Sequence, residues 1–89
     1  MKNLELGTTV MTRGVSALCG GQPELLSQFM RRYQNADWGD LCSEDKEVND
    51  KALEHGGRIL AKYHFNNKPI YIITEADRSA TTVLLPSEY

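Results

Sequence analysis

The sequence predicts an α+β domain in which N-terminal helices pack on a three-stranded antiparallel β meander, or a four-stranded one if the N-terminus adds a strand. Apolar residues recur with helical spacing between residues 23 and 55 and with strand-like alternation between residues 59 and 85. Of the 89 residues, 40% are hydrophobic and 25% are charged, as in ordinary globular proteins. We therefore expect residues 1–89 to form a single small α+β domain.

The N-terminal third predicts a short strand and then a helix. Residues 4–12 include the β-branched run Thr8-Thr9-Val10, which favours a strand, and residues 13–18 can form one helical turn before Gly20-Gly21. Pro23 suits the first position of a helix. The helix predicted over residues 23–34 has an apolar stripe made of Leu25, Leu26, Phe29, Met30 and Tyr33.

A second helix is predicted between residues 43 and 55, after a loop at residues 35–40. Ser43 is a favourable N-cap, acidic residues fill the first turn, and Gly56-Gly57 ends the helix. Its apolar stripe is thin and rests on Val48 and Ala52. We expect this helix to lie on the surface and to be half solvated.

The rest of the chain predicts the meander. Residues 59–65 alternate between apolar and polar, and Asn66-Asn67-Lys68 forms a turn. The strand from Pro69 to about Glu75 is apolar on both faces and should be central. The chain then turns at residues 76–80 and returns through residues 81–85.

Charge excludes some classes of function. The net charge is −2, and residues 37–56 alone carry seven acidic and two basic side chains. A basic footprint for nucleic acid is therefore missing. No apolar run reaches the ~20 residues that span a bilayer, and the N-terminus does not resemble a signal peptide, so we expect a cytoplasmic protein. Cys19 and Cys42 form no CxxC motif and are expected to be free thiols, without a prediction of their reactivity.

Patterns of catalytic chemistry are weak. His55 and His64 lack a partner at metal-ligand spacing, and Ser43-x-x-Lys46 lacks the companion motifs of serine acyl-enzymes. The paired glycines do not follow a strand–loop–helix phosphate pattern. The sequence thus predicts no catalytic residue, no metal site and no cofactor, which argues against an enzyme.

The polar stretch Glu75-Ala76-Asp77-Arg78-Ser79 is the main candidate for a binding site. An arginine presented on a rigid hairpin suits a carboxylate, a phosphate or a peptide. The alternative is a purely structural turn, in which Asp77 and Ser79 form the bend and Glu75 pairs with Arg78.

Trp38 and its acidic neighbours Asp37 and Asp40 are the second candidate. An indole in this loop either fills a gap between the helices and the sheet or anchors a partner, and we favour the first interpretation. The acids of this loop do not follow the ligand register of a calcium-binding loop.

Long segments of the chain resemble a family of small bacterial proteins carried by phages, plasmids and other mobile elements, some of which bear the label of a restriction-system subunit. The resemblance implies no catalytic residues. This chain lacks the glycine-rich motif of a methyltransferase, so the label cannot mean that enzyme. The segments that carry the resemblance are "VMTRGV" (10–15), "NADWGDL" (35–41), "DKEVND" (45–50), "RILAKY" (58–63) and "ITEADRSATTVLLPSEY" (73–89).

Such accessory proteins often bind host machinery. The resemblance therefore implies a small binding protein that acts stoichiometrically on a host protein, as an inhibitor of a defence system such as restriction or CRISPR. A small-ligand-binding protein or minimal enzyme that uses Glu75, Asp77 and Arg78 is the alternative. A homodimer is compatible with the sequence but is not required by it.

Overall fold

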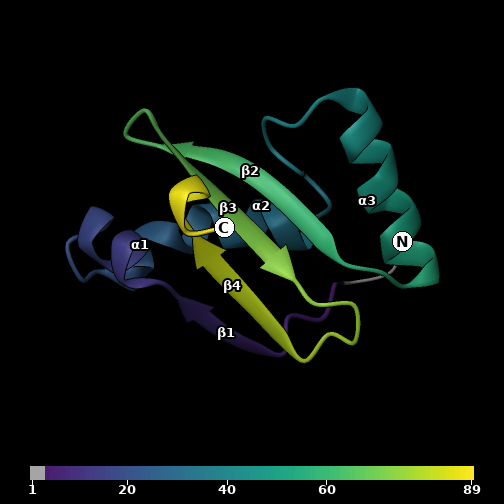
Figure 1. Cartoon of the computed structure of the whole chain (residues 1–89), viewed down its shortest axis with the longest axis horizontal. Coiled ribbons are helices and arrows are strands. Elements are labelled where there is room, and N and C mark those ends of the chain that lie inside the picture. The colour runs from purple at the N-terminus through teal and green to yellow at the C-terminus, as the bar shows by residue number, and fades with distance from the viewer. Residues whose placement is uncertain (1–3) are drawn as a thin grey trace.

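The computed structural model describes residues 4–89, which form four strands, three α-helices and two short 3₁₀ turns. Figure 1 shows the strands side by side in one sheet. In chain order the elements are β1 (Thr8–Met11), α1 (Arg13–Leu18), η1 (Pro23–Leu26), α2 (Ser27–Gln34), α3 (Ser43–His55), β2 (Ile59–Phe65), β3 (Lys68–Thr74), β4 (Ala80–Leu84) and η2 (Pro86–Glu88).

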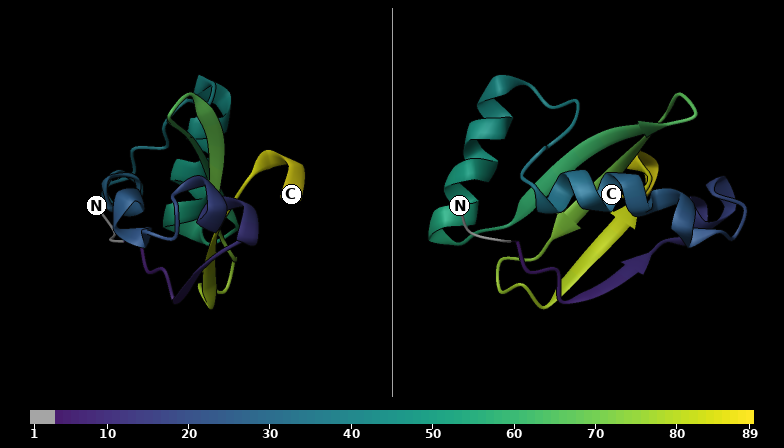
Figure 2. Two further views of the ribbon diagram at one scale, coloured as in Figure 1. Left: turned by 90° about the vertical axis from the view of Figure 1, so that its left-hand side faces the viewer. Right: turned by 180° about the vertical axis from the view of Figure 1, so that it is seen from behind.

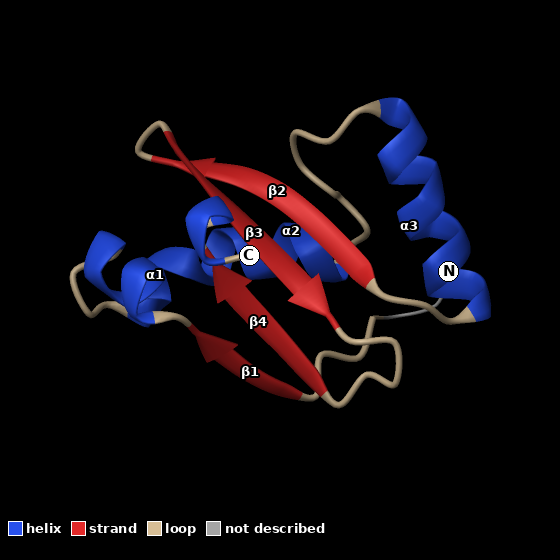
Figure 3. Ribbon diagram, viewed as in Figure 1, coloured by secondary structure: helices blue, strands red, loops and turns tan. Residues whose placement is uncertain are grey.

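The sheet has the strand order β1-β4-β3-β2, which confirms the α+β class and the meander of β2, β3 and β4 (Figure 3). The expectation of a wholly antiparallel sheet is wrong for β1. This strand runs parallel to β4, with Thr8 opposite Ala80 and Met11 opposite Val83. A parallel pair needs a long crossover, and here the helices and the strands β2 and β3 lie between β1 and β4 in the sequence.

Helix α2 covers one face of the sheet, as the view from behind shows (Figure 2). Phe29 of α2 packs on Tyr63 of β2, with 5.4 Å between ring centroids. The rings of Tyr33 and Trp38 meet edge to face at 5.6 Å. The core therefore joins most of the predicted stripe to the inward face of the sheet. The prediction is wrong for Leu25, which is 40% exposed, because residues 23–26 form the 3₁₀ turn η1 and α2 begins only at Ser27.

A chain of hydroxyl groups crosses this core. The Tyr33 hydroxyl lies 2.7 Å from Thr74 Oγ1, which lies 2.8 Å from Thr81 Oγ1, and Thr81 donates to the Leu6 carbonyl at 2.7 Å. Tyr33, Thr74 and Thr81 are fully buried. Every member has a partner, so the chain fastens α2, β3, β4 and the N-terminal segment together without an unpaired polar group.

The opposite face of the sheet is covered more thinly. Ile73 and Leu84 are buried there, which confirms β3 as a central strand that is apolar on both faces. Tyr89 follows η2 onto this face and meets Tyr71 edge to face at 5.9 Å between centroids.

Helix α3 lies beside β2 at one edge of the sheet (Figure 1). It begins at Ser43, but the N-cap position is occupied by Cys42 and no side chain caps it, so the prediction of Ser43 as the N-cap is wrong by one residue. The sequence pattern also places Val48 wrongly, on the inward apolar stripe of this helix. Its side chain is 61% exposed, whereas Asn49 and Ala52 face inward.

Within residues 4–89, no helix is both long and apolar enough to cross a membrane.

Candidate functional site

Arg78 connects the β3–β4 turn to the C-terminal end of α3. Its guanidinium donates to the carbonyls of Ala52 at 3.0 Å, Gly57 at 2.5 Å and Glu75 at 3.2 Å. The last carbonyls of a helix lack partners within the helix and carry partial negative charge. Arg78 therefore acts as a cap for α3, and it holds a left-handed backbone conformation, with φ of 62°, to do so.

The other residues of this turn divide into two groups. Asp77 accepts from the Ser79 backbone N–H at 2.9 Å, and hydrogen bonds from the side chain and backbone of Ser79 lower the pKa of Asp77. Asp77 and Ser79 thus form the bend, as the structural alternative predicted. Glu75 does not pair with Arg78 through its carboxylate. It is exposed and lines a shallow groove with Arg58 and Tyr89.

Trp38 fills a gap between the helical elements and the sheet. Its side chain is 2% exposed and its indole N–H donates to Asp50 Oδ1 of α3 at 2.8 Å. The interpretation of Trp38 as a plug is confirmed. The adjoining Gly39 has φ of 76°, and a side chain there would overlap the carbonyl of Lys62.

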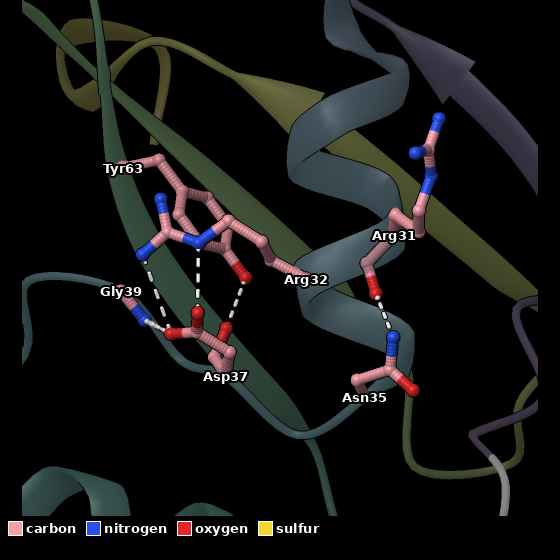
Figure 4. Close-up of polar contacts among 6 residues, drawn as sticks. All are labelled: Arg31, Arg32, Asn35, Asp37, Gly39 and Tyr63. Atoms are coloured by element: carbon pink, nitrogen blue, oxygen red, sulfur yellow. Dashed lines mark hydrogen bonds and ion pairs between the residues drawn. The ribbon is translucent and has the colours of Figure 1, made fainter.

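Asp37 is held by a network that begins on α2 (Figure 4). Arg32 Nε lies 2.8 Å from Asp37 Oδ2, Arg32 Nη2 lies 3.3 Å from Oδ1, and the Gly39 N–H donates to Oδ1 at 3.1 Å. The guanidinium stands 4.9 Å from the centre of the Tyr63 ring, and the Tyr63 hydroxyl donates to the Asp37 carbonyl. The hydrogen bond from Arg32 lowers the pKa of Asp37, while burial raises the pKa of Tyr63.

The side chain of Arg31, next to Arg32 on α2, takes no part in this network. Figure 4 shows its side chain pointing away from the pair of Arg32 and Asp37. The ion pair itself is about half exposed on both sides, so it contributes at most about 1 kcal/mol to the stability of the fold.

Asp40 lies on the outer edge of β2. Its carboxylate is 2.6 Å from His64 Nδ1, and its backbone N–H donates to the Lys62 carbonyl at 2.7 Å. The Lys62 N–H donates in turn to the Trp38 carbonyl at 3.2 Å. The loop at residues 38–40 therefore covers this part of the edge as a short additional strand.

Asn49 is a structural residue that the sequence reasoning missed. Its side-chain amide donates to the Leu60 carbonyl at 2.7 Å and accepts from the Leu60 N–H at 3.3 Å. It thus imitates a neighbouring strand and attaches α3 to the edge of β2. One signal in the sequence could have found it. Asn49 lies three residues before Ala52, so it shares the predicted inward face of the helix with Ala52.

An open groove of about 250 Å³ lies between α3 and the thinly covered face of the sheet. The exposed side chains of Val48 and Tyr89 both border it. Arg58 holds Tyr89 in place: its guanidinium donates to the tyrosine hydroxyl at 3.2 Å and stands 5.3 Å from the ring centre. The lining residues are Leu41, Asp45, Val48, Asn49, Arg58, Leu60 and Tyr89.

Two of the candidate residues, Trp38 and Arg78, contact α3. The Trp38 loop contacts the middle of the helix through Asp50, and the Arg78 turn caps its C-terminal end. Glu75 lines a second groove, which shares Arg58 and Tyr89 with the groove beside Val48. We name the outer face of α3, the groove beside Val48 and Glu75 the α3 surface. Its exposed acidic members on the helix are Glu44, Asp45, Glu47, Asp50 and Glu54.

Within residues 4–89, no group of three or more histidine, cysteine, aspartate or glutamate side chains could hold a metal ion. Cys42 is exposed and Cys19 is buried, and both are free thiols. Comparisons of the chain with protein-family models, with curated proteins and with solved structures found no match.

Proposed function

We propose that this protein is a binding module that acts stoichiometrically on a basic protein partner through the α3 surface. One observation supports this most. The exposed Val48 lies in the middle of an acidic helix and beside a groove that Tyr89 also borders. Five exposed acids on α3 outnumber Lys46, Lys51 and Arg58 around this apolar residue. Exposed apolar surface with a charged rim is a common arrangement of a protein-binding surface.

The chemistry of the partner follows from the charge. Residues 37–56 carry most of the negative charge of the chain, and α3 presents its acids outward. Such a field accelerates the encounter with a basic surface, while the apolar centre adds affinity after water is expelled. We propose, from the resemblance to proteins of mobile elements, that the partner is a nucleic-acid-binding protein of a host defence system.

The alternative, a ligand pocket or minimal active site built on Glu75, Asp77 and Arg78, has less support. The Arg78 guanidinium is directed at three backbone carbonyls, and Asp77 is used by its own turn. Glu75 lines a groove with Arg58 and Tyr89, and neither Asp77 nor Arg78 borders that groove.

The experiment is a pull-down from bacterial lysate followed by calorimetry with the captured protein. Val48→Lys should abolish capture, because it places a long cation in the apolar centre of an acidic surface. Leu25→Lys is the matched control, since Leu25 is also an exposed apolar residue, at 40%, and lies on η1, away from α3. Equal capture by both folded variants would refute the proposal, as would affinity that does not fall with added salt.

A further inference from the structure

Residues 86–89, which we name the strap, lie on the thinly covered face of the sheet. Figure 2 shows the strap on the opposite side of the sheet from α2. Its last residue, Tyr89, is 63% exposed and meets Tyr71 edge to face. The strap therefore covers apolar side chains of the sheet while it stays mostly exposed itself.

Within residues 4–89, hydrogen bonds join the strap to distant parts of the chain through two side chains. Glu88 accepts from the Thr12 hydroxyl at 2.6 Å and from the Gly14 N–H at 3.2 Å. The Tyr89 hydroxyl accepts from Arg58 at 3.2 Å. All three bonds lie in contact with solvent and contribute little, so the strap should open far more easily than the sheet unfolds.

Tyr89 stands between two grooves. The groove beside Val48 and the second groove share Arg58 and Tyr89 among their lining residues. Leu60, which lines the first groove, lies opposite Ile73 of the second, and Ile73 lies opposite Thr82. These three side chains form one row across β2, β3 and β4, so the two grooves become one trough when Tyr89 moves away.

The closed strap depends on a glycine of α1. A side chain at Gly14 would place its Cβ 2.7 Å from Leu85 Cδ1 and 2.8 Å from both carboxylate oxygens of Glu88. Alanine is otherwise the better residue inside a helix. The glycine therefore leaves the room that Glu88 needs to reach α1.

We propose that the strap is a gate of the α3 surface: it opens while the sheet stays folded, and the basic partner binds the open form. This inference rests on the proposed function for the identity of the partner. Charge supports the same partner, since the trough carries Asp45, Glu75 and Glu88 against one cation, Arg58. In the closed form Tyr89 stands in the way of any apolar side chain that the partner inserts.

Thiol labelling tests the opening and needs no partner. In a Cys42→Ser background, Leu84→Cys places a buried thiol in the second groove, where uncharged N-ethylmaleimide reaches it only after the strap opens. Gly14→Ala should raise the labelling rate by roughly threefold to tenfold, because Glu88 loses its place on α1 and the open fraction grows. Cys19, buried at the end of α1, is the internal control, since its labelling would report unfolding of that helix.

Two further variants separate the strap from the helix. Glu88→Ala removes the same contact without an added side chain, so it should raise the rate equally, and the double variant should raise it no further. Ser16→Ala, on the same helix, is the matched control and should leave the rate unchanged. An unchanged rate in Gly14→Ala and Glu88→Ala would overturn the inference, and so would equally faster labelling of Cys19.

Calorimetry tests the gate, with the protein that the wild type captures from lysate, once purified, as the probe. If only the open form binds, Gly14→Ala should lower the Kd by the same factor by which it raises the labelling rate. Faster labelling with an unchanged Kd would overturn the gate and keep the α3 surface as a binding site. Capture of no protein by either chain would refute the proposed function and the gate together, while the labelling rates would still show whether the strap opens.

Discussion

At the scale of single residues, Arg78 shows how a side chain that suggests recognition can be used inside the fold. Sequence alone presents it as a cation on a hairpin. In the structure it donates to three carbonyls, two of which come from the end of α3 and the residues just after it. The hydrogen-bond donors of its guanidinium are therefore used within the fold.

Arg78→Ala should destabilise the protein by about 1–3 kcal/mol, because carbonyls at the end of α3 lose a charged donor. Urea unfolding measures this change. Glu75→Ala is the control from the same turn, and its effect should stay within about 0.5 kcal/mol because the side chain is exposed. If the two variants unfold alike, the capping role is wrong.

Tyr33 gives a prediction for pH. Burial raises the pKa of Tyr33 from 10.0 to about 12. The folded state then holds this proton more tightly than the unfolded state, so the contribution to stability is complete below pH 10.0 and is lost as pH rises towards 12. Denaturant titrations in this range should show a shallower decline for Tyr33→Phe than for the wild type.

The same variant has a cost at neutral pH. Tyr33→Phe removes a member of the hydroxyl chain with Thr74 and Thr81, and should lower the free energy of unfolding by about 1–2 kcal/mol. A variant as stable as the wild type at pH 7 would show that the buried hydroxyl groups of Thr74 and Thr81 are satisfied equally well without the Tyr33 hydroxyl.

At the scale of elements, α3 is attached to the sheet by an amide rather than by an apolar stripe. Asn49→Ala should cost about 1–3 kcal/mol and should increase hydrogen exchange at the Leu60 amide, because both backbone groups of Leu60 lose their partner. Lys51→Ala, on the exposed side of the same helix, is the control. Unchanged exchange at Leu60 in Asn49→Ala would contradict the attachment.

The helices and hairpins were predictable because their signals are local. Pro23 with the stripe through Tyr33, and Asn66-Asn67 between alternating runs, each determine structure within a few residues. The partner of β1 could not be predicted in this way, because it depends on a pairing between segments at opposite ends of the chain. The inward face of α3 was misassigned at Val48, because a hydrophobic pattern cannot reveal an amide that replaces a strand.

The candidate site followed the same division. The turn chemistry of Asp77 and the burial of Trp38 agree with their local interpretations. The capping role of Arg78 needs a helix end that lies far away in the sequence. The groove beside Val48 requires Tyr89, at the C-terminus, to lie across the sheet.

At the scale of the whole molecule, the C-terminal residues hold two distant parts together. Glu88 accepts from the Thr12 hydroxyl at 2.6 Å and from the Gly14 N–H at 3.2 Å, next to the start of α1. Tyr89 covers Tyr71 on the thin face of the sheet. The last residues therefore serve as a cover for this face.

Deletion of residues 86–89 should expose Ile73 and Leu84, lower the unfolding midpoint and increase binding of the dye ANS, which reports exposed apolar surface. Ser87→Ala, a change on the exposed side of the same segment, should do neither. A deletion variant with the same unfolding midpoint and the same ANS fluorescence as the wild type would show that residues 86–89 do not protect this face of the sheet.

The parallel pairing of β1 with β4 also affects how the chain is made. A ribosome releases residues in order, and β4 is the last strand to emerge. While the chain is being synthesised, the first strand has no partner in a sheet, so both its edges stay open until β4 has left the ribosome. We expect the nascent protein to depend on chaperones, or on a slow final step after release, to insert β1 beside its late partner.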